Sequence, residues 1–101
     1  MKIKVKLLKS IREKTFGLLL FDSIQPVLFK TRFGIHTFGM NFPIDVIIIN
    51  KDNVVARIKE NLLPNRIFVW PPQFNKVIEL PANYIKKQNI KIGDKVELDF
   101  Q

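Results

Sequence analysis

Residues 46–49 constrain the fold more than any other part of this sequence, because Val-Ile-Ile-Ile is an unbroken run of β-branched residues. Such residues favour strands, and a strand that is apolar at every position has to be covered on both faces. Residues 50–53, Asn-Lys-Asp-Asn, then supply turn residues. After the turn, Val54, Ala56 and Ile58 alternate on one face of a partner strand that runs to residue 60. The sequence therefore predicts a hairpin at the centre of a sheet.

The rest of the chain contains more strand patterns than helix patterns. At the N-terminus, lysines alternate with apolar residues over 2–7, which predicts a strand with one wet face, and lysines are suited to a sheet edge. Further strands are predicted at 27–33, 77–80 and 95–100, with a brief extended piece at 67–69 inside an irregular segment. Short helices are predicted at 11–16, which follows a capping box, and at 82–88, which Pro81 opens and Asn89 ends.

These elements predict a mainly β (α+β) fold. Strand–helix–strand alternation of the length of a βαβ unit is absent, which favours a compact β-sandwich or small barrel with one or two short helices. A chain of 101 residues that is 47% hydrophobic can build one core, so residues 1–101 are expected to form a single domain.

Composition excludes several kinds of chemistry. Without cysteine there is no disulfide or thiol nucleophile, and with His36 as the one histidine a multi-histidine metal site is excluded within the chain. The two serines lie outside a G-x-S-x-G context, and phosphate-cradling glycine loops are absent. No apolar run approaches the roughly 20 residues of a membrane span, and the N-terminus is unlike a signal peptide. We therefore expect a cytoplasmic, non-catalytic protein without metal, cofactor or membrane.

The net charge of +8 points to anionic partners. The excess lies in residues 1–14, with a local sum of +5, and in residues 51–76, with a local sum of +3. A nucleic-acid-binding surface would use the basic N-terminal strand and the basic residues of 57–66, namely Lys2, Lys4, Lys6, Arg57, Lys59 and Arg66. Since no recognition motif accompanies these residues, such binding would be weak and unspecific.

The segment 31–45 holds the best candidates for a small-ligand site. Two glycines and a proline break it into short extended pieces. Asp45 precedes the buried strand, so its carboxylate needs hydrogen-bond partners, which we expect within residues 31–45. One interpretation is structural, with Asp45 tying the loop to the strand. The alternative is a pocket formed by Arg32, His36, Thr37 and Asp45, in which Arg32 binds an anion.

The same segment carries a family resemblance. The sequence Thr-Arg-Phe-Gly-Ile-His-Thr-Phe-Gly-Met at 31–40, followed by Pro-Ile-Asp at 43–45 and a β-branched strand, resembles the central signature of the family named domain of unknown function 192. The Glu-Leu-Pro at 79–81 and the Gly-Asp at 93–94 also resemble that family, whereas Asn83 stands where many relatives have glycine. The resemblance implies a small β-rich fold and carries no established activity, cofactor or partner.

An aromatic cluster, Trp70 with Phe68, Phe74 and two prolines, lies in the irregular segment. The cluster is expected to fold over the core. If it were exposed, it would instead form a platform for binding peptides or stacking bases. The sequence as a whole favours a non-catalytic binding or accessory module whose partner is a small anionic ligand or a protein. The alternative is the weak nucleic-acid binder.

Overall fold

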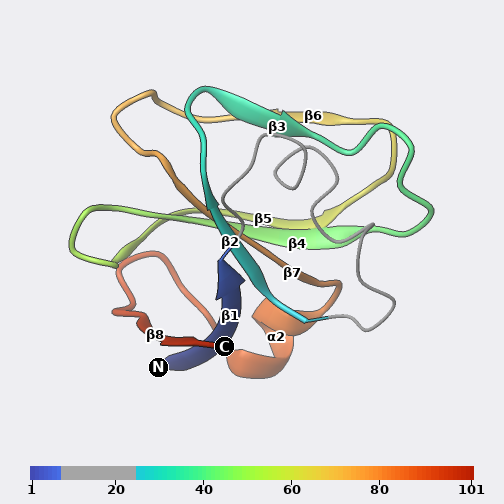
Figure 1. Ribbon diagram of the computed structural model, residues 1–101. Coiled ribbons are helices and arrows are strands. Elements are labelled where there is room, and N and C mark those ends of the chain that lie inside the picture. The colour runs from blue at the N-terminus through green and yellow to red at the C-terminus, as the bar shows by residue number, and fades with distance from the viewer. Residues whose placement is uncertain (8–24) are drawn as a thin grey trace.

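The chain forms two β-layers, a six-stranded sheet and a separate two-stranded sheet that lies over it (Figure 1). The computed structural model describes residues 1–7 and 25–101, so the helix predicted at 11–16 lies outside the described residues. The elements are β1 (Lys2–Leu7), β2 (Val27–Lys30), β3 (Gly34–His36), β4 (Ile44–Ile49), β5 (Val55–Leu62), β6 (Ile67–Val69), β7 (Lys76–Pro81), α2 (Tyr84–Gln88) and β8 (Glu97–Phe100). The mainly β, sandwich-like fold is confirmed, and the two sheets do not close into a barrel.

The large sheet has the strand order β5-β4-β7-β2-β1-β8. All six residues of β4 are buried, and this strand pairs antiparallel with β5 on one side and with β7 on the other. The predicted central hairpin is therefore confirmed. Its turn is held by Asn50, whose Oδ1 accepts hydrogen bonds from the amides of Asp52 (2.9 Å) and Val54 (3.0 Å).

Two hydrophobic cores cover the two faces of the large sheet, because alternate residues of β4 point to opposite sides. Val46 and Ile48 pack with Trp70 in the core beneath the β3–β6 layer. Ile47 and Ile49 join the other core, which includes a residue of α2 and residues of β1. The continuous β-branched run therefore fills both cores, as a strand covered on both faces requires.

The return strand β5 does not present the predicted face. A register shift separates the pair Ile48–Arg57 from the pair Ile49–Val55, so β5 holds an extra residue at this point. Val55, 1% exposed, therefore enters the same core that Ile58 packs against, whereas Val54 and Ala56 are half-buried. The predicted alternation is wrong because a β-bulge reverses which side chains face the core.

The N-terminal strand is confirmed, but its predicted position at a sheet edge is wrong. β1 pairs in parallel with β2 through Lys6 and Leu7, and in parallel with β8 through Lys2 to Val5. Its lysines are exposed because Ile3 and Val5 turn into the core, and not because the strand lacks a neighbour. The alternation of polar and apolar residues predicts which face of a strand is exposed to solvent, whereas the strands that pair with it are set by residues far away in the sequence.

The C-terminal region differs from prediction at its boundaries. Pro81 ends β7, and α2 begins at Tyr84 after Asn83, which adopts a left-handed conformation with φ 73°. Asn89 ends the helix with φ 53°, as predicted. The last strand begins at Glu97, later than expected, because Lys95 forms an isolated bridge with Val54. No helix within the described residues is long and apolar enough to cross a membrane.

Candidate functional site

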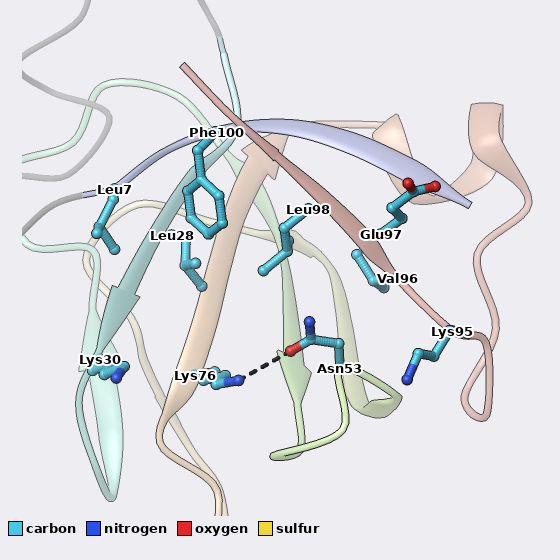
Figure 2. A pocket seen from close by; sticks show the side chains of 10 residues that line it. All are labelled: Leu7, Leu28, Lys30, Asn53, Lys76, Lys95, Val96, Glu97, Leu98 and Phe100. Carbon is cyan, nitrogen blue, oxygen red and sulfur yellow. Dashed lines mark hydrogen bonds between the residues drawn. The ribbon is translucent and has the colours of Figure 1, made fainter.

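A cavity of about 760 Å³ opens where the large sheet divides, and it is the candidate functional site (Figure 2). β1 shares two residue pairs with β2, and its other four pairs are with β8. β8 therefore diverges from β2 and β7, and side chains from the three strands enclose the space between them. The β4–β5 turn adds a further wall, because the Val96 amide donates to the carbonyl of Asn53 (2.8 Å).

The lining of this cavity has an apolar part and a cationic part. The apolar side chains are Leu7, Leu28, Val96, Leu98 and Phe100, and the polar ones are Lys30, Asn53, Lys76, Lys95 and Glu97. Figure 2 shows the three lysines and the asparagine along one side, away from the leucines and the phenylalanine. The cavity is therefore amphipathic, with three ammonium groups against one carboxylate among the lining residues named.

Two of the three lysines are held by hydrogen bonds, one to an amide side chain and one to a backbone carbonyl. Lys30 and Lys76 are directly opposite one another on the antiparallel strands β2 and β7. The Nζ of Lys76 donates to Asn53 Oδ1 (3.0 Å), and the Nζ of Lys95 donates to the carbonyl of Asp52 (2.5 Å). Like charges directly across a sheet destabilise it, so this pairing costs free energy that a bound anion would recover.

Asp45 is fully buried, as the sequence predicts, but its partners lie outside residues 31–45. Oδ1 accepts a hydrogen bond from the amide of Asn61 (2.9 Å), and Oδ2 accepts one from the amide of Ile85 (2.9 Å). The first amide belongs to the irregular end of β5, where Asn61 has φ 54°. The second belongs to the first turn of α2. Asp45 therefore links β4 to β5 and α2, and does not hold the 31–45 loop.

Thr37 is also fully buried and joins two loops. Its hydroxyl donates to the carbonyl of Leu63 (2.7 Å) and accepts from the amide of Arg66 (2.9 Å). Its carbonyl accepts from the amides of Met40 and Asn65. These bonds tie the loop after β3 to the turn before β6.

Arg32 and His36 are exposed, unlike Thr37 and Asp45. The His36 ring stacks on Phe38 at 4.8 Å between centroids, and its Nδ1 accepts from the Phe38 amide (3.2 Å). Among the described residues, no hydrogen bond joins Thr37 or Asp45 to Arg32 or His36. The cavity in Figure 2 is lined by none of the four.

The six basic residues of the nucleic-acid hypothesis fall in separate places. Lys2, Lys4 and Lys6 lie on β1, whereas Arg57 and Lys59 lie on β5, with three strands between them in the sheet order. At about 4.8 Å per strand, the two groups are roughly 19 Å apart. Arg57 is placed over the ring of Phe74, at 5.5 Å from its centroid, and Arg66 lies in the turn before β6.

The aromatic cluster folds over the core, as expected. Trp70 is 5% exposed, and its Nε1 donates to the carbonyl of Phe74 (2.8 Å). Phe68 contacts Trp70 at 5.7 Å between ring centroids. This cluster therefore supports the β3–β6 layer from below.

Other chemistry receives little support from the described part of the chain. Residues 1–7 and 25–101 bring no three metal-ligating side chains together. Burial raises the pKa of the Tyr84 phenol above its usual value, and Tyr84 is not among the cavity residues named.

The cavity was missed in the sequence because its residues come from five separate segments. Lys30 is the last residue of β2 and Lys76 is the first residue of β7, and the two become opposite only through the β2–β7 register. One signal was present in the sequence, since a lysine adjoins the apolar run of each strand. Pairing those two lysines requires knowing which strands are neighbours.

Comparison with known proteins gives this chain a family and a fold. The family model DUF192, described as "Uncharacterized ACR", matches residues 1–98. A protein of unknown function from Novosphingobium aromaticivorans DSM 12444 matches with TM-score 0.78 and 20% identity, over 90% of this chain and 71% of its own. A candidate transcription regulator from Sinorhizobium meliloti 1021 matches with TM-score 0.80 and 22% identity, and the match covers 90% of this chain and 78% of the regulator's chain. A search of curated proteins found no match. At these identities the structures share the fold alone.

Proposed function

The chain belongs to the DUF192 family, which brings no activity with it, and we propose that it is a non-catalytic binding module for a small organic anion with an apolar body. The observation that carries this proposal is the cavity between β2, β7 and β8, whose lysines and apolar residues are segregated. An acid group would lie at the lysines, and the remainder of the ligand would contact the leucines and Phe100. We further propose that residues 1–101 act as one domain, because both cores contain residues from distant parts of the chain.

The opposed lysines support binding of an anion over a neutral ligand. Lys30 and Lys76 repel one another across the β2–β7 pair, and an anion between them would relieve that repulsion. Lys76 already has one hydrogen bond to Asn53, and each ammonium has three donors, so further donors are available. A carboxylate or phosphate monoester is the chemistry that such donors recognise.

The size of the cavity supports a small molecule. Ligand sites usually enclose about 300–1,000 Å³ and are mostly apolar with a few polar groups. The cavity of about 760 Å³ falls within this range, although half of its ten lining residues are polar, which favours a ligand that is itself charged. A medium-chain carboxylate is a suitable probe because it carries one acid group and an unbranched apolar chain.

The test is an NMR titration of isotopically labelled protein with decanoate. We expect amide shifts centred on Asn53, Lys76 and Leu98. The double variant Lys30→Met/Lys76→Met should weaken decanoate binding by about tenfold, the equivalent of one lost charge-assisted hydrogen bond. Decanol, which has the same chain without the charge, should bind more weakly than decanoate to the unsubstituted protein.

The matched control is Lys86→Met/Lys87→Met on the exposed side of α2, which makes the same change in net charge away from the cavity. This control should leave decanoate affinity unchanged. Equal weakening by both double variants would show that the net charge and not the cavity attracts the probe. Shifts that avoid the cavity residues would also contradict the proposal.

A further inference from the structure

The outer face of the β3–β6 layer exposes apolar and aromatic side chains that the proposed cavity does not use. In Figure 1 this layer lies over the large sheet, with its other face turned outward. Ile35 and Phe68 are paired and pack inward, so the pairs on either side of them point outward. These outward residues include Ile67 at 65% exposure and Val69 at 67% exposure. With Phe33 and Phe38, which flank β3, they place four exposed apolar side chains on or beside one short layer, and such a cluster marks an interaction site.

Each end of this outer face carries an aromatic group beside an arginine. At the Ile67 end, His36 is paired with Ile67 and stacks on Phe38 with an interplanar angle of 24°, and Arg66 directly precedes Ile67 in the sequence. At the Val69 end, Arg32 and Phe33 immediately precede β3. Phe33 is 65% exposed and Phe38 is 51% exposed. The exposed rings are therefore distributed along the layer and are not confined to one end.

The backbone at the Val69 end includes an unusual conformation. Phe33 has φ 74°, a left-handed conformation that is rare for a bulky residue. A Cβ on Gly34 would come within 2.7 Å of the Phe68 carbonyl oxygen and 3.0 Å of Val69 Cγ1. Gly34 therefore leaves the surface beside Val69 open, and the adjoining Phe33 ring remains exposed.

The charge on this layer is of one sign. Segments 31–44 and 61–78 contain no aspartate or glutamate, while Arg32 and Arg66 lie on them in exposed positions. Among the described residues neither arginine is in an ion pair, and the guanidinium of Arg66 donates weakly to backbone carbonyls of Pro64 and Asn65 at 3.4 Å. Both guanidinium groups are therefore available to an anion.

From these observations we infer that the outer face of the β3–β6 layer binds single-stranded nucleic acid. Exposed rings at the ends of a short strand give stacking platforms for unpaired bases, and flanking arginines give contacts to phosphates. A site of this size would hold about two to three nucleotides. Duplexes have their bases stacked internally and present no free face to Phe33 or Phe38, so single strands are the expected ligand. The inference is independent of the cavity and of decanoate binding.

The test is fluorescence polarisation with labelled single strands of about 12 nucleotides, in DNA and RNA form, against the matching duplex. Single strands should bind more tightly than the duplex. Phe33→Ala and Phe38→Ala should each weaken single-strand binding by at least about fivefold, whereas Phe38→Tyr, which keeps a stacking ring, should restore most of it. If both arginines contact phosphates, the affinity for single strands should fall by about sevenfold between about 50 and 200 mM salt.

The matched control is Ile92→Ala, which removes an apolar side chain of similar exposure, 64%, from a position outside both this layer and the cavity. It should leave single-strand affinity unchanged. Equal or tighter binding of the duplex would overturn the inference, as would equal effects of Phe33→Ala and Ile92→Ala. Two further results would assign the face to another partner and overturn it: self-association of the unsubstituted protein that Phe33→Ala abolishes, or binding to anionic phosphatidylglycerol vesicles with none to single strands.

Discussion

The large sheet and the β3–β6 layer use the same kinds of residue in opposite ways. In the large sheet, β4 forms six residue pairs with β7 and has no exposed residue. In the layer, β3 forms three pairs with β6, and the paired residues Ile67 and Val69 remain exposed. A long ladder with two covered faces stabilises the fold, whereas a short ladder with one covered face leaves apolar surface for a partner. The two layers therefore differ in how much of their apolar surface is covered, and the exposed part is concentrated on β6.

The variant with the largest expected effect on stability is Trp70→Ala, because Trp70 is the bulky buried side chain beneath the β3–β6 layer. Removing a buried tryptophan should lower the free energy of unfolding by about 3–5 kcal/mol. Urea unfolding followed by circular dichroism measures this change. Trp70→Phe fills most of the volume and should cost clearly less. A loss below about 1 kcal/mol for Trp70→Ala would mean that the layer is not packed on the sheet as described.

Asp45→Ala should have the next largest effect, since it removes both acceptors that join β4 to β5 and α2. Leaving the amides of Asn61 and Ile85 without partners should cost about 1–3 kcal/mol. The measurement is the urea midpoint at constant m-value, with the exposed turn residue Asp52 replaced by alanine as the control. An Asp45→Ala protein as stable as the control would contradict a structural role for this carboxylate.

Thr37→Val should have a smaller and more local effect. The substitution keeps the shape but removes the hydroxyl that bonds Leu63 and Arg66, at a cost of about 0.5–1.5 kcal/mol. Hydrogen exchange should accelerate at the amide of Arg66 before it does so in β4. Thr31→Val, at a half-buried threonine outside this junction, is the control. Uniform acceleration across the chain would mean that the layer unfolds together with the large sheet, which would remove the distinction between them.

Lys30→Met should have the smallest effect and the opposite sign. It relieves the repulsion between Lys30 and Lys76 in the cavity lining, so stability should rise by about 0.2–1 kcal/mol. The gain should shrink as salt screens the charges. Thermal unfolding at low and high salt measures it, with Lys86→Met as the control. A loss of stability at low salt would show that the two ammonium groups do not repel one another in the folded protein.

Residue patterns predicted the elements of this fold where the determinants are local. The β-branched run at 46–49 predicted the buried centre of the sheet, and the Asn50 turn followed from its own side chain. The burial of Trp70 followed from its neighbours in the aromatic cluster. Each of these features depends on residues within a few positions of one another, so a linear pattern carries the necessary information.

Features that depend on pairing across the chain could not be predicted in this way. β1 was expected at an edge, yet it lies between β2 and β8, and its exposed lysines are compatible with either position. Asp45 was expected to bind its own loop, yet its partners are 16 and 40 residues away. The bulge that turns Val55 inward depends on the register with β4.

The sequence by itself determined that the chain is mainly β, that 46–49 is buried, that Asp45 needs partners and that the net charge is +8. Only the tertiary structure decided where the charged and exposed aromatic groups lie, because it placed Lys30 opposite Lys76 and left Phe33 and Phe38 exposed. Composition and alternation fix how much charge and apolar surface a chain carries. The positions of these groups in space depend on strand order and register, which arise from the packing of the whole chain.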